Sequence, residues 1–260
     1  MKINVVATGS SGNCYCIENN GHVIFVDAGA AVRDIKSILD DNESINETSL
    51  FITHEHSDHI KGLVPLINKY NPKIYTSRGT AEVLLRKGVR PEILYPIESN
   101  TNYDFKDFSV RAFNTIHDAA QPFGFRFDFG TDIFSIATDF GVVDDYLLKS
   151  LEGSNVMIVE SNYEEELLKR NNKYPLDLKK RILSKLGHLS NKDAFYLVGE
   201  MGKRGLKKCF LAHVSENSND YDLLENYAKS CNSVHDVDAK VLRQKTRYKH
   251  DELLGTDILI

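Results

Sequence analysis

The segment of residues 51–59, Phe-Ile-Thr-His-Glu-His-Ser-Asp-His, concentrates groups that bind metal ions. His54, His56 and His59 bring three imidazoles, and Asp58 brings a carboxylate, into six residues that follow a short apolar run. Crowded histidines repel one another when protonated and lose hydration when buried, and binding a cation as neutral imidazoles removes both penalties. Because side chains alternate along an extended backbone, we expect His54 and His56 to face one ion. Asp58 and His59, beyond the bend, can face a second.

Three further polar residues stand at the ends of apolar, strand-like runs: His117, Asp139 and His213. Loops at one edge of a sheet are where α/β enzymes place their sites, although each residue alone could equally be a capping or loop residue. Together with the segment of residues 51–59 they complete two three-ligand sets bridged by one carboxylate. Imidazole and carboxylate ligands without a thiolate suit Zn²⁺ or Mn²⁺ and do not distinguish them.

The elements that must position these groups are short β-branched runs alternating with helical patterns. No internal repeat or linker-like stretch divides the chain, so we expect one α/β domain over residues 1–245. A tail of residues 246–260 would pack on the body or on a partner. Strands are predicted at residues 3–7, 15–18, 23–26, 50–53, 73–76, 108–116, 123–129, 133–138, 156–160 and 209–213, and helices at 30–39, 195–201 and 221–228.

The composition describes one globular chain of 260 residues with 42% hydrophobic content and a net charge of −5. That charge argues against a protein held to nucleic acid or membrane mainly by its overall charge. No apolar run approaches the roughly 20 residues of a membrane helix, and the N-terminal sequence lacks the features of a signal peptide. The cysteines at positions 14, 16, 209 and 231 form no CxxC pair, which favours reduced thiols and a cytoplasmic location.

The motif HxHxDH, followed by His, Asp and His at strand ends, resembles the metallo-β-lactamase superfamily over nearly the whole chain. The resemblance implies a four-layer αββα sandwich with a dinuclear metal centre between its sheets. It also implies a ligand assignment, in which Asp139 bridges the two ions. One ion would be held by His54, His56 and His117, and the other by Asp58, His59 and His213.

Several further segments look like one branch of that superfamily, the YycJ/WalJ family. This branch is similar to 5′-to-3′ exonucleases acting on DNA and, more distantly, to ribonuclease Z. The segments are VATGSSGN at 6–13, VDAG at 26–29, THEHSDHIKGL at 53–63, YP at 174–175 with KKRIL at 179–183, GHLSN at 187–191 and LAHVS at 211–215.

The likeness to ribonuclease Z implies a catalytic pair, Glu160 and His188, in which the histidine protonates the leaving oxygen. A general acid of this kind contributes roughly 10²–10⁴-fold. Two adjacent cations lower the pKa of a water between them and stabilise an in-line phosphoryl transition state. Asp58 could orient that water as well as bind metal. The alternative for His188 is a structural neighbour of a helix that begins near Ser190.

Substrate-binding residues are expected in two segments. Residues 169–185 hold seven basic residues and one acid, which favours a patch that tracks a polynucleotide backbone. A solvated helix face balanced by the glutamates at 164–166 is the alternative. Residues 10–13 could present amides or hydroxyls to a phosphate, or form only a tight turn. The candidates are Lys179, Lys180, Arg181, Ser10, Ser11 and Asn13.

The leading hypothesis is a metal-dependent nuclease or phosphodiesterase acting on DNA. Its nearest rival cleaves a cyclic nucleotide messenger, as some phage-type proteins that this fold resembles do, in a closed pocket that a second subunit of a homodimer would complete. Antibiotic or thioester hydrolysis is disfavoured because no secretion signal is visible. A catalytically inactive binding protein is disfavoured because all seven ligand positions are filled.

Overall fold

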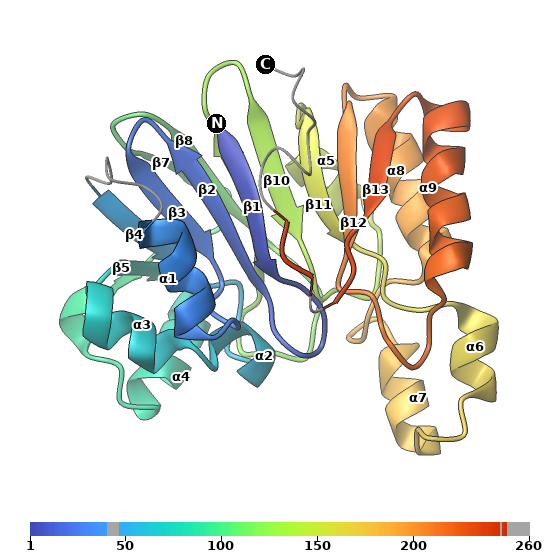
Figure 1. The fold of residues 1–260 in the computed structure, drawn as a ribbon, viewed down its shortest axis with the longest axis horizontal. Helices are drawn as coiled ribbons and strands as arrows, with labels where there is room; N and C mark the ends of the chain where they lie inside the picture. Colours follow the sequence, from blue (N-terminus) through green and yellow to red (C-terminus); the bar gives the residue numbers. More distant parts are fainter. Residues whose placement is uncertain (41–46, 245, 249–260) are drawn as a thin grey trace.

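The structure, a computed structural model, describes residues 1–40, 47–244 and 246–248. Its strands form two mixed sheets that pack face to face (Figure 1). The first sheet has the order β1-β2-β3-β4-β5-β6, and the second the order β13-β12-β11-β10-β9-β8-β7. The first comprises β1 (Lys2–Ala7), β2 (Cys14–Asn19), β3 (His22–Val26), β4 (Glu47–Phe51), β5 (Lys73–Thr76) and β6 (Leu94–Pro96). The second comprises β7 (Asn102–Asp104), β8 (Ser109–Asn114), β9 (Phe123–Asp128), β10 (Ile133–Ala137), β11 (Val156–Glu160), β12 (Lys208–Ala212) and β13 (Asp238–Val241).

Helices cover the outer face of each sheet, so the molecule has four layers (Figure 1). The first sheet is covered by α1 (Val32–Asp40), α3 (Leu63–Tyr70) and α4 (Arg78–Arg86). The second is covered by α5 (Asp145–Leu151), α8 (Asn191–Gly202) and α9 (Tyr221–His235). The remaining helical segments are α2 (Ser57–Ile60), a 3₁₀ turn (Pro91–Ile93), α6 (Glu165–Arg170) and α7 (Leu176–Ile182). This is the αββα architecture predicted from the sequence.

Alternating side chains explain why the two sheets stack. Along β9, Phe123, Phe125 and Phe127 are fully buried and enter the core between the sheets. Along β11, Ile158 faces that central core while Met157 packs under the helices on the other side. Strands with apolar residues on both faces require cover on both faces, and the helical layers supply it.

Each sheet changes from antiparallel to parallel pairing at its middle. In the first sheet, β1, β2 and β3 are antiparallel, whereas β3, β4, β5 and β6 run parallel. In the second, β7 to β10 are antiparallel and β10 to β13 run parallel. The loops that leave β4, β10 and β12 lie at one edge of the sandwich, at the bottom of Figure 1.

The predicted elements are present with shifted ends, and the structure adds several that the sequence analysis did not predict. Strands β6, β7 and β13 have three or four residues each and lie at or next to sheet edges. The strand predicted over 108–116 ends at Asn114, and the helix predicted from residue 195 begins at Asn191. Helices α2 to α7 were also missed. All four cysteines are buried and free, as expected.

The start of the predicted C-terminal tail lies against the body. Tyr248 exchanges two backbone hydrogen bonds with Val5, at 2.8 and 3.0 Å, and its ring packs against the central core. Residues 249–260, the rest of that tail, lie outside the described residues. Over the described part of the chain, no helix is both long enough and apolar enough to cross a membrane.

Candidate metal centre

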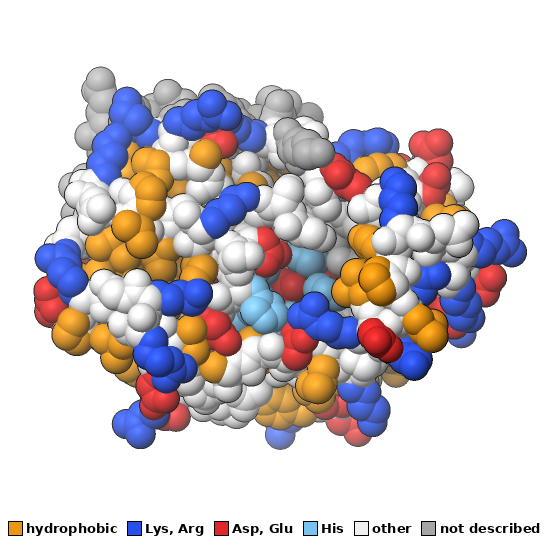
Figure 2. Space-filling view, turned by 90° about the horizontal axis from the view of Figure 1, so that it is seen from below, with side chains coloured by type: hydrophobic (Ala, Val, Ile, Leu, Met, Phe, Trp, Pro, Cys, Tyr) orange, Lys and Arg blue, Asp and Glu red, His pale blue; other side chains and the backbone are white. Residues whose placement is uncertain are grey.

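The residues predicted to bind metal gather at one edge of the sandwich, where loops of both sheets meet. His54, His56, Asp58 and His59 follow β4 of the first sheet, and the others follow β8, β10 and β12 of the second. Seen from below, histidines lie at the floor of a hollow with Lys and Arg side chains on either side (Figure 2). The strand ends therefore bring residues from 54 to 213 into one site, as the sequence analysis predicted.

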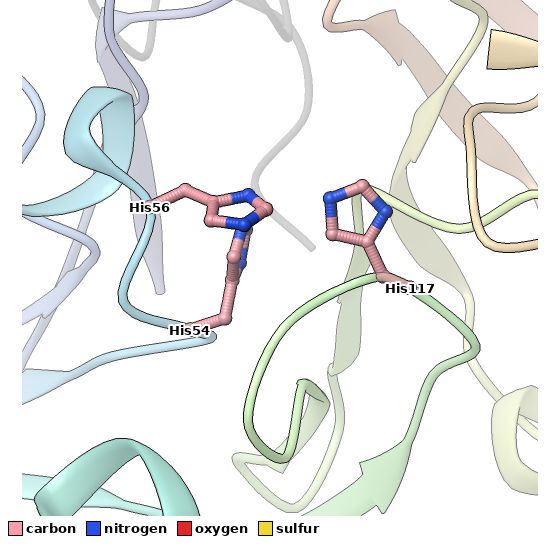
Figure 3. A group of neighbouring side chains, drawn as sticks. All are labelled: His54, His56 and His117. Carbon is pink, nitrogen blue, oxygen red and sulfur yellow. The ribbon is translucent and has the colours of Figure 1, made fainter. Parts of the chain in front are cut away.

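The first ligand group is formed by His54, His56 and His117. Figure 3 shows His54 and His56, from the segment after β4, pointing toward His117 from the segment after β8. Their ring centroids lie 4.6 to 5.2 Å apart, and one ring nitrogen from each histidine lies within 4.8 Å of the others. Three imidazoles in this arrangement can share one ion.

Buried ring nitrogens that make no hydrogen bond indicate that the site fits a cation. The Nε2 atoms of His54, His117 and His213 are buried and make no hydrogen bond to any described residue. Burial is the main cause that lowers the pKa of His54 and His117, so both imidazoles are neutral with a lone pair facing the site. Buried nitrogen without a partner costs stability, and a divalent cation removes that cost.

The second ligand group is formed by Asp58, His59, Asp139 and His213. Oδ2 of Asp139 lies 3.2 Å from Nε2 of His59, and Oδ1 lies 3.5 Å from Nε2 of His213. Oδ2 of Asp58 lies 3.5 Å from the same atom of His59 and 3.6 Å from that of His213. Ligand atoms at about 2 Å from one ion are roughly 3.3 Å apart in a tetrahedron, which matches this spacing.

Asp139 connects the two groups. Its Oδ1 lies 3.9 Å from Nε2 of His117 in the first group, while both of its oxygens face histidines of the second. Burial raises the pKa of this carboxyl, but the surrounding histidines outweigh burial and hold it well below its usual range. An ionised carboxylate between two sets of imidazoles is placed to bridge two cations.

A buried carboxylate, Asp27, orients His59. Its Oδ2 lies 2.7 Å from Nδ1 of His59, and it also accepts hydrogen bonds from the backbone and hydroxyl of Thr53. This contact leaves Nε2 of His59 facing the site, which is how carboxylates outside a metal centre fix a ligand's orientation. The sequence analysis gave Asp27 no role. The only signal was its place in the segment VDAG, at the end of a predicted strand.

Three residues of the centre have a left-handed backbone conformation, which residues other than glycine rarely adopt. Asp27, Asp139 and His213 have φ angles of 63°, 59° and 53°. Asp27 and His213 directly follow the last residue of a strand, and one residue separates Asp139 from the strand before it. The left-handed backbone at each position turns the side chain toward the site. Such strain costs about 1–3 kcal/mol per residue and persists where the surrounding structure holds it, typically at functional sites.

The predicted catalytic pair lies beside the second group. Nδ1 of His188 is 2.6 Å from Oε1 of Glu160, and the same oxygen lies 3.0 Å from Nδ1 of His213. Burial lowers the pKa of His188, but the Glu160 carboxylate outweighs it and raises the pKa above the ordinary value. Ser190 caps the following helix, as the alternative for His188 expected, and His188 lies two residues before that cap. Glu160 therefore supports both a metal ligand and a candidate acid.

A backbone carbonyl and a side-chain amide orient two other ligands, His117 and His213. The sequence alone assigned no such role to either orienting group. The carbonyl of Gly187 lies 3.0 Å from Nδ1 of His117. Asn162 has its side-chain amide 3.1 Å from Nδ1 of His213 and donates to that residue's carbonyl. A backbone acceptor leaves no trace in residue type, so Gly187 could not have been predicted.

A pocket of about 240 Å³ opens next to His188, and among the predicted basic residues Arg181 lines it. Here we call it the His188 pocket; its other lining residues include Ser10, Asn162, Tyr174 and Ser215. Arg181, on α7, pairs with Asp118, which follows the ligand His117.

The structure places the other predicted substrate-binding residues in different surroundings. Lys179 donates to the carbonyl of Lys169, and Lys180 lies 3.8 Å from Asp177, so neither lines the His188 pocket. Lys169, at the start of the basic segment, pairs with Glu165 as the solvated-face alternative expected.

The segment of residues 10–13 divides into an exposed and a buried part. Ser10 and Ser11 are exposed, and Ser10 reaches the pocket wall. Asn13 is buried against the metal centre, with its amide nitrogen 3.1 Å from His59 Nε2 and 3.3 Å from Asp58 Oδ2.

The chain belongs to the metallo-β-lactamase superfamily, because the family model described as "Beta-lactamase superfamily domain" matches residues 22–213. The resemblance stated from the sequence is confirmed, and with it the fold. The chain is accordingly a hydrolase whose His and Asp groups are arranged to hold divalent metal.

Two relatives indicate which branch of the superfamily the chain is similar to. The chain is 32% identical over 227 residues to exodeoxyribonuclease YycJ of Bacillus anthracis, covering 86% of each chain. It is 34% identical over 230 residues to exodeoxyribonuclease WalJ of Streptococcus pneumoniae, covering 86% of this chain and 85% of that one. Among solved structures, the metallo-β-lactamase fold protein YhfI of Bacillus subtilis superposes with a TM-score of 0.71 at 17% identity, covering 96% and 100% of the two chains.

Proposed function

We propose that the chain is an exonuclease that hydrolyses phosphodiester bonds of DNA from the 5′ end, with two divalent ions, Zn²⁺ or Mn²⁺. The observation that carries this proposal is Asp139, one carboxylate shared by two ligand groups, beside the Glu160–His188 pair. The names of the relatives from Bacillus anthracis and Streptococcus pneumoniae, both exodeoxyribonucleases, support the choice of DNA.

The residues divide the work of hydrolysis. Two ions held by the two ligand groups would lower the pKa of a water between them and would offset charge on the phosphoryl group. Asp58, whose pKa is held far below its usual value by contacts to His213 and His59 that outweigh burial, stays ionised and accepts a hydrogen bond from the attacking water. His188 donates its proton to the departing oxygen. Burial opposes the charged imidazole, but the Glu160 carboxylate outweighs burial and raises the pKa of His188, which favours the protonated form that a general acid needs.

The substrate enters through the hollow of Figure 2. Arg181 and the hydroxyl of Ser10 contact a phosphate or sugar in the His188 pocket, while Tyr174 offers an aromatic face to a base. Lys179 and Lys180 add positive charge to α7 without lining the pocket. Ser11 and Asn13 belong to the loop between β1 and β2, over which the DNA strand passes.

The test is hydrolysis of single-stranded DNA labelled at either end, compared with cyclic mononucleotides, by metal-stripped protein with and without added Zn²⁺ or Mn²⁺. We expect mononucleotides from the 5′ end, two bound ions by elemental analysis, and no reaction with chelator. Cleavage of cyclic nucleotides alone would replace this function with that of a messenger phosphodiesterase. Two bound ions without either reaction would favour an inactive binding protein. Light scattering tests the homodimer, which stays a prediction.

A further inference from the structure

A second pocket, of about 680 Å³, lies beside the metal centre in addition to the His188 pocket. The loop of residues 9–12 stands between the two, because Ser10 lines the His188 pocket and Ser11 lines this one. Its wall includes the first turn of α1 and residues 61–62 between α2 and α3. We refer to it as the Arg33 pocket, after its most exposed basic residue.

The charge of the Arg33 pocket is opposite to that of the whole chain. Arg33, Lys61 and Arg247 line it together with one acid, Asp34, whereas the chain carries a net charge of −5. Small residues, among them Gly29, form much of the remaining surface. A wide, open basic surface with few large side chains fits a polyanion better than a compact apolar ligand.

Arg33 and Arg247 are available to a new anion. Both pair with Asp34, and their side chains are 86% and 51% exposed. Since both guanidinium groups face solvent, each can bind a phosphate on its outer side while it keeps its contact with Asp34, whose side chain is 17% exposed.

The Arg33 pocket is joined rigidly to the metal ligands. Lys61 directly follows α2, the turn that carries Asp58 and His59, and its ammonium group donates to the carbonyl of Ser11. The backbone of Asn13 donates to the carbonyl of Asp58 and accepts from the amide of Gly29. A Cβ at Gly29 would lie 1.7 Å from the carbonyl oxygen of Asp58, so only glycine permits this contact. These contacts fix Gly29 and Lys61 of the pocket wall relative to Asp58.

We propose that the Arg33 pocket binds the phosphate backbone of the DNA strand on the 3′ side of the bond that is cut, an assignment that rests on the proposed function. Hydrolysis from the 5′ end breaks the bond between phosphorus and the 3′ oxygen of the first nucleotide. Water forms the new bond to phosphorus and releases one proton to solvent, while the departing 3′ oxygen takes a proton from His188, which regains one from solvent. The released nucleotide therefore lies beside His188, and the shortened strand, with its new 5′ phosphate, extends over Ser11 toward Arg33.

Two pockets on either side of the loop of residues 9–12 also separate long from small substrates. A nucleotide ester carries no phosphate beyond the one that is cut, whereas a longer strand carries further phosphates on the 3′ side that can reach the three cations beyond Ser11. Each phosphate contact on a single strand contributes roughly 0.7 to the slope of log affinity against log salt. The Arg33 pocket therefore predicts a salt dependence that small esters do not share.

The experiment compares the double variant Arg33→Gln/Arg247→Gln with the wild type on a 30-nucleotide single strand, over a series of salt concentrations. The reference substrate is the p-nitrophenyl ester of thymidine 5′-phosphate, which has no phosphate beyond the one that is cut and so offers none to Arg33 and Arg247. We expect the ratio of KM for DNA to KM for the ester to rise about tenfold at low salt. The salt slope for DNA should fall by roughly 1.4, two contacts at 0.7 each.

Two matched variants control for charge and for folding. Arg86→Gln/Lys87→Gln removes the same charge at the far end of α4 and should leave the salt slope at the wild-type value, whereas Arg33→Lys/Arg247→Lys keeps the charge and should restore it. An unchanged slope and KM ratio in Arg33→Gln/Arg247→Gln would overturn the assignment. A wild-type protein that hydrolyses the ester but no DNA would instead overturn the proposed function.

Discussion

The two ligand groups of the metal centre use similar residues but are supported in different ways. In the group of His54, His56 and His117, burial lowers the pKa of the first and third imidazoles. In the second group, the carboxylates around His59 and His213 outweigh burial and raise the pKa of both well above the ordinary value. Without ions, His54 and His117 of the first group are neutral ligands, whereas the second group is held together by internal ion pairs. A cation enters the first directly, but must displace protons from the second.

The largest effect on both ligand groups is expected from Asp139→Asn, because Asp139 is shared by the two groups. We expect the loss of one bound ion and a fall in kcat of about 10³-fold or more, since several kcal/mol of transition-state stabilisation depend on the ions. Elemental analysis and steady-state kinetics measure the two effects. Two ions retained with kcat within tenfold of wild type would show that the groups do not depend on a shared carboxylate.

A smaller effect is expected from His188→Gln, which removes the general acid and leaves the metal ligands in place. We expect kcat on DNA to fall by roughly 10²–10³-fold with an unchanged metal content. The p-nitrophenyl ester, whose leaving group needs no proton, should lose much less. An equal loss on both substrates would assign His188 to binding.

Loss of the contact that orients His59 should lower the metal affinity of the second ligand group and leave that of the first unchanged. Asp27→Asn removes the carboxylate beside this ligand, and we expect the affinity of the second group for its ion to fall roughly 10–100-fold. Calorimetric titration should resolve one weakened and one unaffected binding step. Equal weakening of both steps would show that the two groups do not bind independently.

The pH dependence of metal binding follows from the different pKa shifts of the histidines in the two ligand groups, and it is the smallest effect expected. A histidine with a raised pKa must lose its proton to bind an ion, so affinity falls as pH falls below that pKa. Between pH 7 and pH 6 we expect about a tenfold loss at the second group for each such proton, and a smaller loss at the first. Proton release on titration with Zn²⁺, measured in two buffers, checks the number of protons. Equal release at both steps would contradict the comparison.

Much of the site could be predicted from the sequence because its ligands follow strands. His117, Asp139 and His213 each end an apolar run, and parallel strands place such ends at one edge. The orienting contacts could not be predicted, because they depend on which strands are neighbours: Asp27 reaches His59 only because β3 pairs with β4.

The missed elements are those with weak sequence patterns. Helix α7 has seven residues, of which Ile182 alone is buried, so it shows little of the periodicity that marks a helix. Strands β6 and β7 have three residues each, too few to show alternation. Short elements of this kind are specified by their neighbours rather than by their own residues, as in the contact of Arg181 on α7 with Asp118.

The left-handed backbone at Asp27, Asp139 and His213 has a consequence for how this chain can change. Side chains with a Cβ lose roughly 1–2 kcal/mol in that conformation and glycine does not, so a stable fold and a working centre make opposed demands at these three positions. Asp139→Gly and His213→Gly should therefore melt at a higher temperature than alanine substitutions at the same places. A descendant that lost its activity would be free to relax there first, and glycine at these positions would identify it.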